Sequence, residues 1–211
     1  MTYVKICGIT NFEDALFAAQ AGADMLGFNF YRASSRYIDP LAARAIIEEL
    51  SAPDLLMVGV FVNEASPDVV RRLANESGVG ALQLHGDESP EYCSALNHQQ
   101  VIKVLRVSQE FVPERALNYE VEGIMLDAFD KKLRGGTGHV IDWSIARRTR
   151  ELTPKLFLAG GLSPENVGAA VVQVQPYAVD SCSALETSPG RKDPERVAAF
   201  VRAAKAAGVK P

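Results

Sequence analysis

The chain has 211 residues, of which 47% are hydrophobic and 23% are charged, an ordinary composition for a globular protein. The formal net charge is −4, with acidic and basic residues interspersed, so we expect no nucleic-acid partner. The apolar runs are of strand length, too short to cross a bilayer, so we expect no membrane association. No Pro/Gly/Ser-rich linker divides the sequence, and we expect one domain over residues 1–211.

The cysteines carry information about the cellular compartment. Cys7, Cys93 and Cys182 are an odd number of thiols at no metal-like spacing. This pattern argues against a disulfide framework and against a zinc site, and it suits a reducing cytosol. The segment from Met1 to Lys5 leads directly into a strand-like run, without the apolar stretch of a signal peptide. We therefore expect a cytoplasmic protein.

Short apolar runs alternate with longer amphipathic segments along the whole chain. Continuous apolar runs are typical of parallel strands that are buried on both faces. Eight such strands are predicted, at Tyr3–Cys7, Met25–Phe30, Leu55–Val62, Gly80–Leu84, Val101–Val107, Gly123–Leu126, Lys155–Ala159 and Tyr177–Ser181.

Helix patterns lie between these runs, and many begin with Ser-Pro or Asp-Pro pairs, which favour helix starts. Thr10 to Glu13 resembles a capping box, and Gly22 and Gly78 suit helix ends. The predicted helices are Asp14–Ala21, Pro40–Leu50, Asp68–Ser77, Glu91–Leu96, a short segment to Leu117, Trp143–Leu152, Glu165–Val174 and Glu195–Ala207. Eight strands in strict alternation with eight helices predict the α/β class and a single (β/α)₈ TIM barrel.

In such barrels the active site lies at the carboxyl ends of the strands, and phosphate groups bind to the loops after strands 7 and 8. Gly160 and Gly161 follow the seventh predicted strand and precede a helix, which suits an anion. Asp180, Ser181 and Ser183 follow the eighth. The glycines at 135, 136 and 138 are a candidate third wall. The alternative is that the glycine pairs only make tight turns.

Two residues at strand ends are candidates for acid–base chemistry. Cys7 ends the first predicted strand, and a positive neighbour such as Lys5 or Arg36 would lower the pKa of its thiol so that it can act as a base. Asp127 follows the sixth strand, and a dry pocket would raise the pKa of its carboxyl group so that it can act as an acid. Position alone leaves two alternatives open: an inert buried thiol and a loop-capping carboxylate.

Several motifs together resemble the phosphoribosylanthranilate isomerase family of tryptophan biosynthesis. They occur in family order and cover nearly the whole chain. The matching stretches are residues 4–10, 26–31 with 34–37, 58–63, 82–88, 126–128, 135–138, 158–162, 166–167 and 188–193.

The resemblance implies an Amadori rearrangement, in which N-(5-phosphoribosyl)anthranilate becomes 1-(2-carboxyphenylamino)-1-deoxyribulose 5-phosphate. It assigns the general base to Cys7 and the general acid to Asp127, and it matches Arg36 to the residue that binds the anthranilate carboxylate. It implies a phosphorylated small molecule as the only ligand and no metal or organic cofactor. The oligomeric state is left open between monomer and homodimer.

Other positions also have candidate assignments. His85 has two interpretations, as a lining residue of the pocket that binds substrate or as a brace for the following turn. Cys93 and Cys182 are interpreted as structural. Ala184 departs from a glycine that is usual in the family, and an alanine would be strained there if the backbone needs a positive φ.

Three rival functions are considered. The first is the same chemistry on an aminoimidazole substrate of the histidine pathway, although enzymes of that kind usually have an aspartate where Cys7 stands. The second is a barrel that binds a phosphorylated ligand without turnover. The third is a Schiff-base aldolase that uses Lys5 or Lys103.

Overall fold

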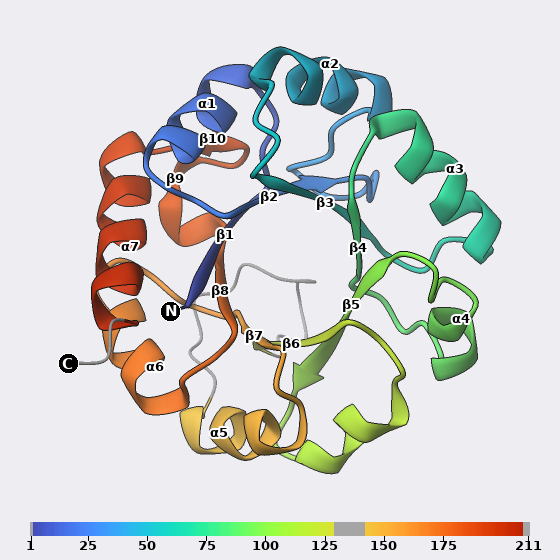
Figure 1. Cartoon of the computed structure of the whole chain (residues 1–211), viewed down its shortest axis with the longest axis vertical. Coiled ribbons are helices and arrows are strands. Elements are labelled where there is room, and N and C mark those ends of the chain that lie inside the picture. The colour runs from blue at the N-terminus through green and yellow to red at the C-terminus, as the bar shows by residue number, and fades with distance from the viewer. Residues whose placement is uncertain (1, 129–141, 209–211) are drawn as a thin grey trace.

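The eight predicted strands close into one parallel barrel, in chain order around the ring. The computed structural model describes residues 2–128 and 142–208. The barrel strands are β1 (Tyr3–Cys7), β2 (Met25–Asn29), β3 (Leu56–Phe61), β4 (Ala81–Leu84), β5 (Gln100–Val107), β6 (Gly123–Ala128), β7 (Leu156–Leu158) and β8 (Ala178–Ser181). Figure 1 shows the strands at the centre, with the helices in a ring around them. The predicted TIM barrel is confirmed.

The described residues contain seven α-helices rather than eight. They are α1 (Phe12–Gln20), α2 (Pro40–Leu50), α3 (Pro67–Ser77), α4 (Pro90–Ser94), α5 (Trp143–Leu152), α6 (Val167–Val174) and α7 (Pro194–Ala207). The segment predicted as the fifth helix is instead the 3₁₀-helix η1 (Pro113–Asn118). Short segments of this kind often adopt the tighter 3₁₀ pattern of hydrogen bonds.

The start of α1 differs from the predicted capping box. The Asn11 side-chain oxygen accepts a hydrogen bond from the N–H of Asp14 at 2.9 Å, so Asn11 is the N-cap. Thr10 has another task, because its hydroxyl donates to the Gly190 carbonyl at 2.6 Å. The first helix is therefore linked to a loop about 180 residues later in the chain.

Side chains on each strand alternate between the barrel interior and the helix layer. Further from the carboxyl ends of the strands, the barrel interior is apolar and includes Met125 of β6 and Ala178 of β8. Two residues further along the same strands, the interior positions are Asp127 and Asp180, both buried. The inward-facing side chains of β6 and β8 therefore change from apolar to ionisable toward the carboxyl ends of the strands.

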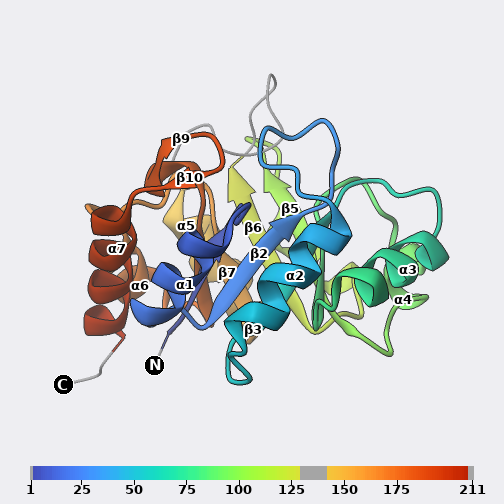
Figure 2. The same ribbon diagram turned by 90° about the horizontal axis from the view of Figure 1, so that it is seen from above.

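The segment after β8 contains a short helix and a hairpin that were not predicted. The 3₁₀-helix η2 (Ser183–Leu185) leads into an antiparallel hairpin of β9 (Glu186–Ser188) and β10 (Arg191–Lys192). Its strands of three and two residues are too short for a periodic sequence pattern. Figure 2 shows the hairpin above α7, at the end of the barrel to which the β6 arrow points. It therefore lies at the rim where the site is expected.

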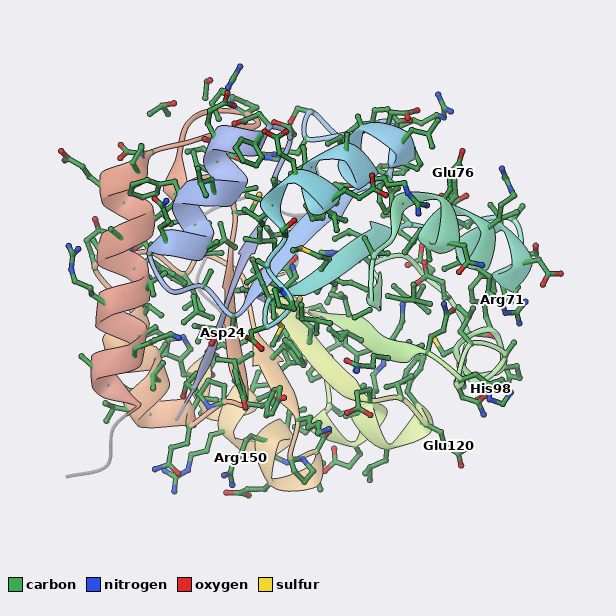
Figure 3. The ribbon with its side chains drawn as sticks, turned by 45° about the horizontal axis from the view of Figure 1, so that its top comes forward. Asp24, Arg71, Glu76, His98, Glu120 and Arg150 are labelled. Carbon is green, nitrogen blue, oxygen red and sulfur yellow. The ribbon has the colours of Figure 1, made fainter. Side chains whose placement is uncertain are left out.

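The outer surface of the helix ring is charged. Arg71 and Glu76 of α3 and Arg150 of α5 point outward from the barrel (Figure 3). Among the described residues, no helix combines the length and the apolar character that crossing a bilayer requires.

Candidate active site

A pocket of about 980 Å³ lies at the carboxyl ends of the barrel strands. Its lining includes Cys7 of β1, Gln83 of β4, Asp127 of β6 and Asp180 of β8. All nine residues predicted for the site lie in this one pocket: Cys7, Arg36, His85, Asp127, Gly160, Gly161, Asp180, Ser181 and Ser183. The structure therefore brings the predicted residues together.

Cys7 is a buried thiol at the end of β1, beside the ammonium group of Lys5. Gly27 of the adjacent strand leaves room for both groups, because a Cβ there would lie 2.7 Å from Cys7 Sγ and 3.0 Å from Lys5 Nζ. A hydrogen bond from Cys182 and the charge of Lys5 hold the pKa of Cys7 well below its usual range, although burial opposes them. The arrangement therefore favours a thiolate.

Lys5 is fully buried and pairs with Asp180 across the β1–β8 interface, with 2.9 Å between Nζ and Oδ1. Burial disfavours the charged form of Lys5, but the negative charges of Asp180 and Cys7 outweigh it and raise its pKa. Burial also raises the pKa of Asp180 to about 6, against the opposing charge of Lys5. At neutral pH the pair is ionised, and the Asp180 carboxylate faces a cation rather than an anionic ligand.

Asp127 lies inside β6 rather than after it, and both of its oxygens are engaged. Oδ1 accepts the N–H of Ala128 at 2.9 Å, and Oδ2 lies 3.1 Å from Nε2 of His85. The other ring nitrogen of His85, Nδ1, lies 3.0 Å from Nε2 of Gln83. Gln83, His85 and Asp127 therefore form a line of hydrogen-bonding groups that ends at the pocket.

The loop after β7 brings backbone close to Asp127. Gly160 and Gly161 have φ angles of +81° and +70°, which favour glycine. A Cβ on Gly160 would lie 2.5 Å from the Ala128 nitrogen and 3.1 Å from Asp127 Oδ1. This glycine is therefore required by conformation and by space, and it leaves backbone rather than a side chain facing the pocket, as a phosphate loop needs.

The loop after β8 is connected to the loop after β7. The hydroxyl of Ser181 donates to the Leu162 carbonyl at 2.7 Å, so this side chain links the two loops. Ala184 lies in η2, and the non-glycine residues with positive φ in the described ranges are Ser51, Asn63 and Gln175. The strain considered for an alanine at position 184 is therefore not present.

Arg36 comes from the loop after β2 and is held by the β9–β10 hairpin. Its Nη2 lies 2.7 Å from Oε2 of Glu186, and its Nε lies 3.1 Å from each oxygen of that carboxylate. Lys192, nearly fully buried, approaches Oε1 of Glu186 at 3.0 Å. These hydrogen bonds orient the Arg36 guanidinium at the pocket wall, and Nη1 also donates to the Ser35 hydroxyl at 3.3 Å. The guanidinium has five N–H groups, and those not used in these contacts can bind a ligand.

The interpretation of Cys182 as purely structural is incomplete, because Cys182 lines the pocket and hydrogen-bonds to Cys7. The sequence analysis also missed Gln83, Glu186 and Lys192. The sequence held a signal for Gln83 and for Cys182. Gln83-x-His85 and Asp180-x-Cys182 repeat the spacing of Lys5-x-Cys7, which directs both side chains to one face of a strand.

The lysines proposed for Schiff-base chemistry are both engaged. Lys103 lies 2.6 Å from Oε2 of Glu88 and donates to the Gly86 carbonyl at 2.9 Å. Neither Lys103 nor Lys5 is among the residues that line the pocket. A buried lysine whose amino group is held in an ion pair is a poor nucleophile, so these contacts disfavour the aldolase alternative.

Two other assignments differ in outcome. Cys93 is buried in α4, away from the pocket, and burial raises the pKa of its thiol to about 11, in keeping with a structural role. The predicted third wall at glycines 135, 136 and 138 lies outside the described residues.

A thiol beside a lysine and a carboxyl group beside a histidine, on strands of one barrel, define an acid–base enzyme on a (β/α)₈ scaffold. The model of the N-(5'phosphoribosyl)anthranilate (PRA) isomerase family matches residues 4–203. The chain belongs to this family.

Individual relatives agree over the full length. N-(5'-phosphoribosyl)anthranilate isomerase of Trichlorobacter lovleyi is 47% identical over 98% of this chain and 100% of its own. The crystal structure of phosphoribosyl anthranilate isomerase from Thermotoga maritima has a TM-score of 0.91 at 44% identity and covers 98% of this chain and 100% of its own. Another such structure, in complex with reduced 1-(o-carboxyphenylamino)-1-deoxyribulose 5-phosphate, has a TM-score of 0.87 at 44% identity, with the same shares covered.

Proposed function

We propose that Cys7 and Asp127 carry out the isomerisation of N-(5-phosphoribosyl)anthranilate in this pocket. The chain is an isomerase of tryptophan biosynthesis, and its product is 1-(2-carboxyphenylamino)-1-deoxyribulose 5-phosphate. One observation carries the assignment of roles. A thiol whose pKa is lowered and a carboxyl group that contacts a histidine line the same pocket, which gives the reaction its base and its acid.

The order of strands gives the substrate an orientation. β7 and β8 lie between β6 and β1 in the barrel, so the two proposed phosphate loops lie between Asp127 and Cys7. A phosphate held by backbone N–H groups at Gly160, Gly161 and Ser183 would place the ribose between the acid and the base. Arg36 then faces the anthranilate, and its planar guanidinium suits the carboxylate of that ring.

The reaction needs one proton given and one taken. Asp127 protonates the ring oxygen as the C1–O bond of the furanose breaks, which leaves a Schiff base with the anthranilate nitrogen. The Cys7 thiolate then removes the proton from C2, and the electrons form the enolamine. Tautomerisation of the enolamine gives the ketone of the product.

Asp127 must hold a proton at the start of this sequence. His85 is placed to orient the carboxyl group that carries this proton, because its Nε2 lies 3.1 Å from Oδ2 of Asp127. We therefore change the expected task of His85 from substrate binding to positioning the acid. Asp180 changes in the same way, since its carboxylate holds Lys5 beside Cys7.

We also propose a cytoplasmic location and an assembly that is a monomer or a homodimer. All three cysteines are free, which suits a reducing compartment. Sedimentation velocity at micromolar concentration would measure the assembly.

The test is turnover of freshly prepared phosphoribosylanthranilate, followed by the loss of its fluorescence. We expect turnover without added metal and no effect of a chelator. Cys7→Ala and Asp127→Asn should each lower kcat by about 10²–10⁴-fold, the usual contribution of a positioned acid or base. Cys93→Ala is the matched control and should keep its activity, because this thiol lies outside the pocket.

Two outcomes would contradict the proposal. Absence of turnover at micromolar enzyme would refute the activity for this chain. Nearly full activity of Cys7→Ala or Asp127→Asn would remove that residue from the mechanism.

A further inference from the structure

We propose that Cys182 is a positioning residue, whose S–H group donates a hydrogen bond to the thiolate of Cys7. The inference rests on the proposed function, because it assigns a partner to the proposed base. It concerns a second thiol that the mechanism above does not use.

The strand register brings the two thiols together. Along β1 and β8, Lys5 is the partner of Asp180, and Ile6 is the partner of Ser181. Cys7 is the next residue of β1, and Cys182 directly follows the end of β8. Because adjacent strands lie about 4.8 Å apart and side chains alternate, the two cysteines follow Lys5 and Asp180 on the interior face.

Two glycines leave room for these sulfur atoms. A Cβ on Gly8 would lie 2.8 Å from Cys182 Sγ, and a Cβ on Gly27 would lie 2.7 Å from Cys7 Sγ. Both thiols also line the pocket. Both sulfur atoms are therefore part of the packing at the pocket wall.

The surrounding charges decide which thiol ionises. Cys7 has Lys5 directly beside it, whereas the S–H group of Cys182 can also donate to Oε1 of Glu186, at 3.6 Å. That oxygen already accepts hydrogen bonds from Arg36 and Lys192, so it does not depend on the thiol as a donor. Lys192 Nζ, 3.8 Å from Cys182 Sγ, lies closer to Glu186, at 3.0 Å, and so neutralises that carboxylate first. A negative charge is thus favoured on Cys7, while Cys182 keeps its proton and remains a donor.

The pKa shifts of the two thiols agree in direction with this assignment. The hydrogen bond between them lowers the pKa of Cys7 and raises the pKa of Cys182. Other charged groups act on the pair from the adjoining elements and remain in place when Cys182 is replaced. They are Lys5, Arg36, Asp180, Glu186 and Lys192.

The experiment measures the titration of Cys7 itself. The rate of its alkylation by iodoacetamide is followed from pH 5.5 to 9.5 by mass spectrometry of the peptide that contains Cys7. Cys182→Ala removes the donor and should raise the apparent pKa of Cys7 by about one pH unit, the effect of one hydrogen bond to a charged group. At pH values below both apparent pKa values, alkylation should then be about tenfold slower, and it should recover at high pH.

Two further variants sharpen the test. Cys182→Ser keeps a donor at this position, so Cys7 should titrate close to wild type. Cys93→Ala deletes a thiol away from the pocket and should leave the profile of Cys7 unchanged. The value of kcat/KM should follow the same pattern, with the loss in Cys182→Ala confined to low pH, whereas a merely structural role would lower it at every pH.

An unchanged Cys7 titration in Cys182→Ala would overturn the proposal. An apparent pKa of Cys7 that rises by about one pH unit in Cys182→Ser would also overturn it, because serine keeps a donor at this position. This second variant keeps the test valid even if Cys182→Ala does not fold. Absence of turnover by the wild type would refute the proposed function, and the alkylation profile would still decide whether Cys182 acts on Cys7.

Discussion

Gln83 determines which ring nitrogen of His85 carries the proton. Its side-chain nitrogen lies 3.0 Å from Nδ1 of His85, while its oxygen is buried without a partner among the described residues. If the amide donates to Nδ1, the ring proton resides on Nε2, where it points at Asp127. A single glutamine therefore fixes the tautomer of the histidine that serves the proposed acid.

Replacing this amide should separate activity from stability. Gln83→Leu removes the hydrogen bond to His85 and should lower kcat about tenfold, or about 1.4 kcal/mol of activation free energy, with little change in KM. The free energy of unfolding should not fall, because the variant also removes a buried oxygen that has no partner. Steady-state kinetics and urea unfolding measure the two quantities.

A matched control exists at Gln99, whose side-chain oxygen is also buried without a partner in the described ranges but lies outside the pocket. Gln99→Leu should keep kcat. Equal activity of Gln83→Leu and wild type would show that His85 needs no help from Gln83.

The loop after β7 depends on a glycine for two separate reasons, conformation and space. Gly160→Ala places a side chain at a φ of +81° and 2.5 Å from the Ala128 nitrogen. We expect a loss of at least about 2 kcal/mol in the free energy of unfolding, together with a higher KM for the phosphorylated substrate.

Gly78→Ala separates the two causes. Gly78 has nearly the same φ, +78°, but a Cβ there would meet nothing within 4 Å. That variant should lose only about 1 kcal/mol, the cost of the backbone conformation. Equal losses in the two variants would show that space at Gly160 is not limiting.

At the scale of helices and strands, the sequence was most informative where the pattern repeats. Continuous apolar runs located all eight barrel strands, with ends displaced by at most two residues. The β9–β10 hairpin could not be found this way, because its strands are shorter than the period that would reveal them. Motifs at strand ends placed Cys7 and Asp127 correctly in one pocket.

The partners of those residues were harder to predict, since they come from other strands. Nothing in the local sequence relates Lys5 to Asp180, which are 175 residues apart. Barrel closure brings β8 next to β1, and only the register makes these two residues neighbours. The position of Cys182 in the pocket was hard to predict for the same reason, because it depends on what lies across that interface.

The stability of the whole molecule should carry the signature of Asp180. Burial raises the pKa of this carboxyl group from its ordinary 3.8 to about 6 in the folded protein. A group whose pKa is raised on folding contributes stability that is fully present below pH 3.8 and is lost as the pH rises through about 6. The full change amounts to at most about 3 kcal/mol.

Asp180→Asn removes this titration, so the comparison is between two pH dependences rather than two absolute stabilities. When the pH falls from 7 to 5, the wild type should gain stability relative to Asp180→Asn, as measured by urea unfolding at each pH. Asp54→Asn is the control, because this exposed carboxylate lies in the turn between α2 and β3, and its curve should run parallel to wild type. Parallel curves for wild type and Asp180→Asn would mean that the Asp180 carboxyl group has the same pKa in the folded and unfolded chains, and that the charge of Lys5 fully compensates its burial.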